Sequence, residues 1–183
     1  DLGAPGHAVI SARGRGYNSS ADTCDAEMMS GTSMATPVTA GNAALLRDYI
    51  GQGRLATRLA NMADNCGSGC DDYYPSLNTT SPSGALVKAL LLHSGEPMTA
   101  RHMNDSWAPS SVLDLPYYAA SSPDFFQGFG RVTLDNLLHT AIYVDDMPMN
   151  GGSISSDEEL AYSLTVTDDS DPLVATLVWM DPP

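Results

Sequence analysis

The sequence predicts an α/β fold over residues 1–141, followed by an incomplete all-β sandwich over residues 142–183. Three observations support this prediction. A short strand pattern precedes a long alanine-rich helical segment near the N-terminus, and two further helical segments follow later in the chain. After Ala141 the helical spacing gives way to an alternation of apolar and polar residues, which is typical of strands.

The first predicted elements are a strand and a helix, separated by a polar loop. Residues 8–12, AVISA, follow a Gly/Pro turn and predict a short strand, and the loop covers residues 13–25. The segment from Thr32 or Ser33 to about Tyr49 predicts the helix. Its many small side chains favour close approach of other backbone segments, so we expect this helix to be buried.

Two more helices are predicted further along the chain. Residues 84–93, GALVKALLLH, follow serines that can cap a helix and precede Gly95, which can end one. Residues 128–141, GFGRVTLDNLLHTA, begin with a tight glycine turn and continue as a short helix. The i, i+3, i+4, i+7 spacing of one buried face is kept by Leu134, Leu137, Leu138 and Ala141.

The C-terminal segment predicts strands. Residues 162–167, YSLTVT, alternate between apolar and polar, and residues 173–180, LVATLVWM, are apolar on both faces, as in the core of a sandwich. A domain boundary is predicted near Tyr143, just before the linker-like MPMNGGS. Because two or three strands cannot bury a sandwich core, we expect this second domain to be truncated.

Composition and charge argue against several classes of protein. Hydrophobic residues make up 43% of the 183 residues, which is enough for a folded core. The formal net charge of −14 argues against nucleic-acid binding, because that affinity comes from lysine and arginine. No apolar run approaches the roughly eighteen residues of a membrane helix, and DLGAPGHAVISA lacks the pattern of a signal peptide.

Cysteines and glycosylation motifs favour a secreted or lumenal protein. Cys66 and Cys70 frame CGSGC, which can close a small disulfide or remain as two free thiols, and Cys24 is left over. A zinc site is disfavoured, because no second Cys or His pair has suitable spacing. The acceptor motif N-x-S/T occurs at Asn18, Asn78 and Asn104.

The segment SGTSMATP, residues 30–37, places Ser33 at the start of the long predicted helix. A serine hydroxyl becomes an effective nucleophile when a base takes its proton and backbone N–H groups hold the oxyanion. A helix N-terminus offers such donors, Gly31 permits a sharp turn, and Pro37 is tolerated in a first turn. The alternative is that Ser33 or Thr32 merely caps the helix.

GTSMATP resembles the nucleophile motif of the subtilisin-like serine proteases, the subtilase family. DLGAPGHAVISA looks like the family's APG segment, and TPVTAGNAALL looks like the continuation of its central helix. SPSGALVKALLLHSG and GFGRVTLDNLL resemble its last two helices. VATLVWMDPP resembles a strand of the β-sandwich that follows in one branch of the family. The resemblance implies the C-terminal part of a three-layer catalytic domain with a parallel sheet.

The resemblance also implies that Ser33 is the nucleophile and that its own backbone N–H is half of the oxyanion hole. The family's chain order is Asp, His, Ser, so both partners must precede Ser33. His7 is the one histidine there, and it lacks the family's HGT context. Asp1, Asp22 and Asp25 lie in no D-[ST]-G context. We therefore expect the base, the aspartate and the oxyanion asparagine to come from upstream sequence.

Other polar residues carry weaker predictions. No cofactor is assigned; acidic turns could supply oxygens to calcium, which many members of the resembled family bind, but solvated turns are the better interpretation. These turns hold Asp71, Asp72, Asp145, Asp146, Asp168, Asp169 and Asp171. His93 shares a helix face with Leu86, which predicts a packed structural histidine, while His102 and His139 match nothing catalytic.

The sequence thus predicts a fragment of a secreted serine endopeptidase that cleaves polypeptides through an acyl-enzyme on Ser33. Its partners are the substrate and the upstream part of the same catalytic domain. We expect the chain alone to be inactive, because it lacks the base. The alternative is a non-catalytic truncated relative that acts as a secreted binding or adhesion module, and upstream D-[ST]-G and HGT motifs would discriminate between the two.

Overall fold

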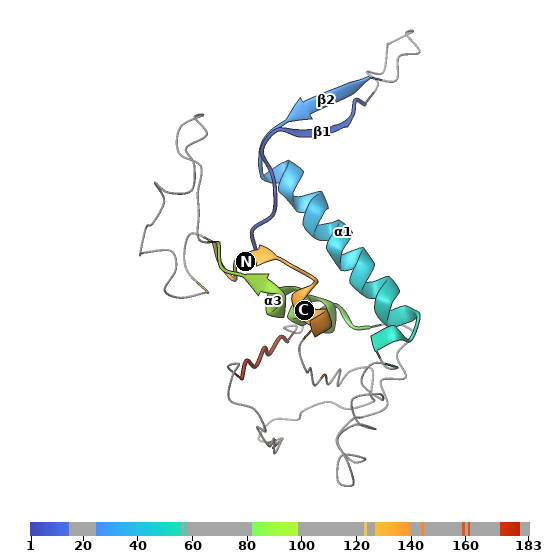
Figure 1. Cartoon of the computed structure of the whole chain (residues 1–183), viewed down its shortest axis with the longest axis vertical. Coiled ribbons are helices and arrows are strands. Elements are labelled where there is room, and N and C mark those ends of the chain that lie inside the picture. The colour runs from blue at the N-terminus through green and yellow to red at the C-terminus, as the bar shows by residue number, and fades with distance from the viewer. Residues whose placement is uncertain are drawn as a thin grey trace. The chain divides into compact units, whose positions relative to one another are not determined.

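In the computed structural model, the described residues are 1–14, 25–55, 57, 82–98, 123, 127–139, 144, 159, 161 and 173–179 (Figure 1). The chain divides into two compact units. The first comprises Asp1–Asn42 and Pro97–Val132, and the second comprises Ala43–Glu96 and Thr133–Pro183.

A β-hairpin lies at the start of the first unit. Strands β1 (Val9–Ala12) and β2 (Ala26–Met29) pair antiparallel, with Val9 opposite Met29. The strand predicted for residues 8–12 is therefore confirmed. Strand β2 adds to the predicted elements, because AEMM has little intrinsic strand preference and becomes a strand through its pairing with β1.

The N-terminal segment of the first unit lies along a glycine turn. Gly3 N–H donates to the Gly130 carbonyl at 2.7 Å, and Phe129 N–H donates to the Asp1 carbonyl at 2.8 Å. The short strand β4 (Arg131–Val132) follows this turn. Gly130 has a φ of 92°, a conformation that favours glycine, which confirms the tight glycine turn predicted for this segment.

Helix α1 (Thr32–Gly51) confirms the predicted long helix. Pro37 is its sixth residue and so lies beyond the first-turn position expected for it. In that place the proline lacks the N–H that would bond to the Ser33 carbonyl.

The expectation that the long helix is buried is met only near its end. Among the described residues of α1, Leu46 and Ile50 are buried, whereas Leu45 is 63% exposed. The described residues supply no layer against the middle of the helix: a Cβ at Gly41 would meet nothing within 4 Å.

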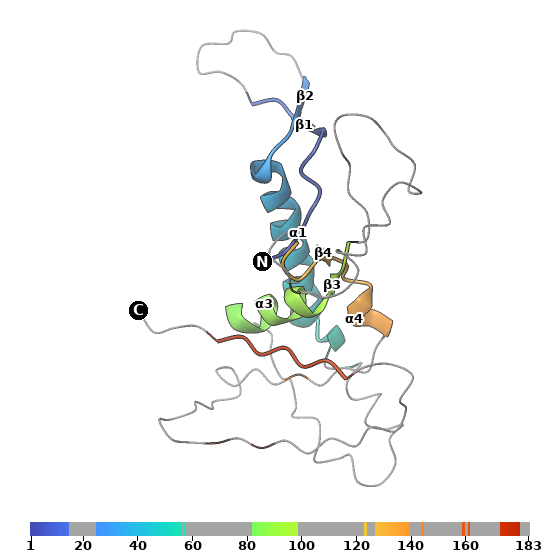
Figure 2. The same cartoon turned by 90° about the vertical axis from the view of Figure 1, so that its left-hand side faces the viewer.

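The second unit has its apolar core around α3 (Gly84–His93), which matches the predicted helix (Figure 2). Ser83 caps this helix, as expected, because its Oγ accepts the Leu86 N–H at 3.0 Å. Strand β3 (Gly95–Glu96) follows directly. Among the described residues of this unit, the buried side chains include Leu46, Ile50, Leu55, Leu86, Val87, Leu90, Leu91, Leu137 and Val144.

Helix α4 (Asn136–His139) is shorter than the third predicted helix. Leu137 is buried as expected, but Leu138 is 48% exposed. The predicted apolar face needs about two helical turns, from Leu134 to Ala141. Helix α4 has only one turn, so this face is only partly formed. Ala141 lies outside the described residues.

The strand predicted for residues 173–180 does not form in the described segment, residues 173–179. Leu177 is 82% exposed and Trp179 is 69% exposed. A strand needs a hydrogen-bonded neighbour, and the expected neighbour at residues 162–167 lies outside the described residues. No sandwich is evident among the described residues, so the sandwich and the boundary near Tyr143 stay predictions.

Candidate active site

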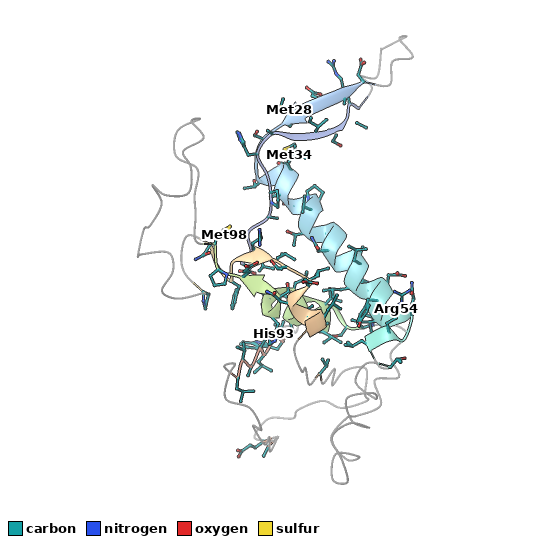
Figure 3. The ribbon with its side chains drawn as sticks, in the orientation of Figure 1. Met28, Met34, Arg54, His93 and Met98 are labelled. Carbon is teal, nitrogen blue, oxygen red and sulfur yellow. The ribbon has the colours of Figure 1, made fainter. Side chains whose placement is uncertain are left out.

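Ser33 is the second residue of α1, and its side chain is exposed. Met34 N–H and Ala35 N–H both donate to the Gly31 carbonyl, at 3.0 and 3.3 Å. The Ser33 N–H precedes these donors and belongs to the helix end where N–H groups have no partner inside the helix. Figure 3 labels Met34 at this end of α1. An exposed hydroxyl whose own N–H lies in the first turn of a helix can meet a substrate carbonyl, so the placement suits the predicted role of Ser33.

The turn that leads into α1 depends on two glycines. Gly31 has a φ of 148°, a conformation that favours glycine, and its N–H donates to the Gly6 carbonyl at 2.7 Å. A Cβ at Gly6 would lie 2.7 Å from the Gly31 carbonyl oxygen and 3.1 Å from Ala35 Cβ. The absence of a side chain at Gly6 therefore lets the APG segment approach the turn before Ser33.

Ser30 joins the same two segments through its side chain. Its Oγ accepts the Ala8 N–H at 2.9 Å and lies 3.3 Å from His7 Nδ1. The hydroxyl that the His7 imidazole approaches is thus that of Ser30, three residues before Ser33. Sequence reasoning did not predict these contacts, because they span 22 and 23 residues and no spacing pattern marks them.

His93 is half-buried on α3, and its Nδ1 lies 3.0 Å from Thr176 Oγ1. This contact ties the C-terminal segment of the second unit to the helix and suits the structural role predicted for His93. His139 is the last residue of α4. Asp1 and Asp25 are exposed.

Many residues considered from the sequence lie outside the described residues. They are Asn18, Asp22, Cys24, Cys66, Cys70, Asp71, Asp72, Asn78, His102, Asn104, Asp145, Asp146, Asp168, Asp169 and Asp171. In the described ranges, no three His, Cys, Asp or Glu side chains gather as a metal site. Across the same residues, no helix has both the length and the apolar character needed to cross a membrane.

The family model of the subtilases, Peptidase S8, matches residues 1–130. The matched region contains the APG segment, the turn before Ser33, helices α1 and α3 and the glycine turn at its end. The chain therefore belongs to the subtilase family, which confirms the resemblance seen in the sequence. Membership implies an α/β fold for this region.

Two curated proteins of Dictyostelium discoideum are similar to this chain. The serine protease/ABC transporter B family protein tagB is 26% identical over 221 residues, and its tagD counterpart is 26% identical over 226 residues. Each match takes in 100% of this chain but only 11% of the relative, so the chain spans a small part of their length. No solved structure matches the chain.

Proposed function

We propose that this chain carries the nucleophile of a subtilase catalytic domain and that Ser33 forms an acyl-enzyme with a peptide substrate. The observation that carries the proposal is the place of Ser33: it is exposed and second in α1, and its own N–H belongs to the first turn, where N–H groups have no partner inside the helix. The family match supports the reaction class. A histidine and an aspartate from sequence ahead of Asp1 complete the triad.

In the proposed reaction, Ser33 Oγ bonds to the carbonyl carbon of the scissile peptide while the upstream histidine takes the hydroxyl proton. The carbonyl oxygen becomes an oxyanion, to which the Ser33 N–H donates. The C–N bond then breaks, and the histidine gives its proton to the departing amine. Water attacks the acyl-enzyme in the same manner, which releases a carboxylic acid and restores the serine hydroxyl.

The described residues contribute more than the nucleophile to this reaction. The positive end of the α1 dipole favours the oxyanion, because it lies at the N-terminus beside Ser33. The turn held between Gly6 and Gly31 sets the direction from which the hydroxyl meets the substrate.

Labelling the full-length protein with a fluorophosphonate tests the proposal. An activated serine bonds to the phosphorus of this probe and displaces fluoride. We expect a stoichiometric adduct on Ser33, located by mass spectrometry, and none in Ser33→Ala. Peptide hydrolysis should fall by about a millionfold in the same variant, the loss known for the nucleophile of subtilisin.

The matched control is Ser11→Ala, because Ser11 is an exposed serine on β1. In this variant, the probe should label Ser33 and the protein should hydrolyse peptides at the parental rates. A parent protein without an adduct on Ser33, or hydrolysis by Ser33→Ala within about tenfold of the parental rate, would contradict the proposal.

We propose further that the protein enters the secretory pathway. The acceptor motifs at Asn18, Asn78 and Asn104 support this proposal. Expressed in a secretory cell, the protein should lose mass on treatment with an endoglycosidase. The triple Asn→Gln variant should not shift, and an unshifted parent protein would contradict the assignment.

A further inference from the structure

The Ser30 hydroxyl lies where two segments of the first unit meet, just ahead of Ser33. Ser30 follows β2 and leads into the turn at Gly31, whereas Ala8 leads into β1. The Ala8 N–H donates to Ser30 Oγ at 2.9 Å, and His7 Nδ1 lies 3.3 Å from the same oxygen. The Ser30 side chain thus contacts both His7 and Ala8, the two residues just before β1.

A second hydrogen bond runs beside this contact in the opposite direction. The Gly31 N–H donates to the Gly6 carbonyl at 2.7 Å, while the Ala8 N–H donates to Ser30 Oγ. The segment with Gly6 and Ala8 and the segment with Ser30 and Gly31 therefore each donate one hydrogen bond and accept one. Two bonds at adjacent positions fix both the separation and the direction of the turn, whereas a single bond would allow it to pivot.

The chain conformation at Ala8 also depends on its surroundings. Ala8 has a φ of 52°, in the left-handed region that residues other than glycine seldom adopt. Such a conformation persists when surrounding contacts determine it, and the bond from its N–H to Ser30 is such a contact.

The hydrogen-bonding capacity of the three groups is compatible with this arrangement. A serine hydroxyl has one proton and two acceptor positions. It accepts the Ala8 N–H, and its own proton can point to His7 Nδ1 when that nitrogen carries no hydrogen, so that His7 can fix the rotation of the hydroxyl.

We propose that Ser30 is a positioning residue for Ser33: its hydroxyl, oriented by His7, holds the turn that sets the place of the nucleophile. The proposal rests on the function proposed above for Ser33. Removing the hydroxyl leaves the hydrogen bond between the Gly31 N–H and the Gly6 carbonyl as the remaining link of the two described above, so the turn can pivot and Ser33 loses alignment. Loss of alignment lowers the rate of the chemical step more than it lowers binding.

The experiment compares Ser30→Ala, Ser30→Thr, His7→Ala and the control Ser11→Ala in the full-length protein. The rate of fluorophosphonate labelling of Ser33 is measured against probe concentration, which separates the maximal rate from the apparent affinity. We expect Ser30→Ala to lower the maximal rate about tenfold without a change in affinity. Ser30→Thr keeps the hydroxyl and should restore most of the rate, and Ser11→Ala should match the parent.

His7→Ala keeps the Ala8 bond and should lower the maximal rate by about threefold, a smaller loss than that of Ser30→Ala. It also serves as the second variant if Ser30→Ala does not fold. A maximal rate in Ser30→Ala or His7→Ala equal to the parental rate would overturn the proposal, as would Ser30→Thr as slow as Ser30→Ala. If the probe labels Ser33 of the parent protein but the variants behave in one of these ways, only the positioning role of Ser30 is refuted. If the parent protein is not labelled at all, the proposal that Ser33 is the nucleophile is refuted as well.

Discussion

Gly6 is the residue whose replacement should most directly disturb Ser33, the proposed nucleophile. A methyl group there would lie 2.7 Å from the Gly31 carbonyl oxygen and 3.1 Å from Ala35 Cβ, so the turn or the start of α1 has to shift. A displacement of about 1 Å in a reacting group can lower a rate about a hundredfold. We therefore expect Gly6→Ala to slow labelling of Ser33 about a hundredfold in the full-length protein.

The control for this variant is Gly14→Ala, because a Cβ at Gly14 would meet nothing within 4 Å. It makes the same chemical change in the same segment and should leave the labelling rate unchanged. Equal rates in the two variants would show that the close approach of Gly6 to Gly31 does not hold the nucleophile in place.

Ala8 offers a test of backbone strain at the same site. Its φ of 52° suits glycine and is worst for β-branched residues. We expect Ala8→Val in the full-length protein to lower the free energy of unfolding by about 1–2 kcal/mol, measured by urea denaturation. Ala12→Val is the control, since Ala12 is exposed on β1, where valine suits a strand. A loss of the same size in Ala12→Val would exclude the φ angle as the cause.

At the scale of elements, α1 and α3 could be predicted because their signals are local. Small helix-forming residues follow a glycine turn in α1, and a capping serine precedes α3. Strand β2 could not be predicted, because a strand is defined by its partner as much as by its own residues. The same reason explains why the strand predicted for residues 173–180 is not seen in residues 173–179. Their apolar side chains favour a strand, but they have no paired neighbour among the described residues.

The site was predictable to the same extent as the elements that form it. Ser33 could be placed at a helix start because Gly31 and the helix residues adjoin it in sequence. The contacts of Ser30 with Ala8 and His7 join segments that the loop after β1 separates, and no periodicity records such tertiary contacts. Family resemblance led to Ser33 as the proposed nucleophile, whereas the contacts of the turn before it could be found only in the structure.

Helix α3 should contribute strongly to the stability of the second unit. Leu90 is only 5% exposed and lines a pocket of about 250 Å³ together with Leu46 and Leu137. Removing its side chain enlarges a space that the neighbours already leave open, which raises the cost of the cavity. We expect Leu90→Ala in the full-length protein to lower the free energy of unfolding by about 3–5 kcal/mol, measured by hydrogen exchange in α3.

Leu177→Ala is the control for this prediction, because the Leu177 side chain is 82% exposed in the same unit. Its effect should stay within about 0.5 kcal/mol. If both variants lose the same stability, the core does not lie where the structure places it.

For the whole molecule, net charge and apolar exposure act in opposite directions. The charge of −14 favours solubility by mutual repulsion. Large apolar side chains that are 62–82% exposed occur at Ile10, Met28, Leu45, Leu173, Leu177 and Trp179. We expect the 183-residue chain, purified alone, to be poorly soluble or partly molten and to bind the dye ANS, with near-ultraviolet circular dichroism as the second measurement. A well-soluble chain with sharp aromatic signals and no dye binding would contradict this expectation.

The same 183-residue chain should not react with a fluorophosphonate. Without a base to take its proton, the Ser33 hydroxyl stays a poor nucleophile at neutral pH. Mass spectrometry after incubation with the probe checks this expectation. A stoichiometric adduct on Ser33 would mean that these residues contain a base, and His7 would be the first residue to replace.

The hydrogen bond between Gly3 and Gly130 has a consequence for biosynthesis. At about 5–20 residues per second, a ribosome needs on the order of ten seconds to proceed from one glycine to the other. The hydrogen bond between Gly6 and Gly31 can form early in that interval. The residues before Gly6 still lack their hydrogen-bond partner, because Gly130 has not been synthesised. In a nascent chain that stalls before Gly130, the turn before Ser33 can therefore be formed while Gly3 still lacks the hydrogen bond to Gly130.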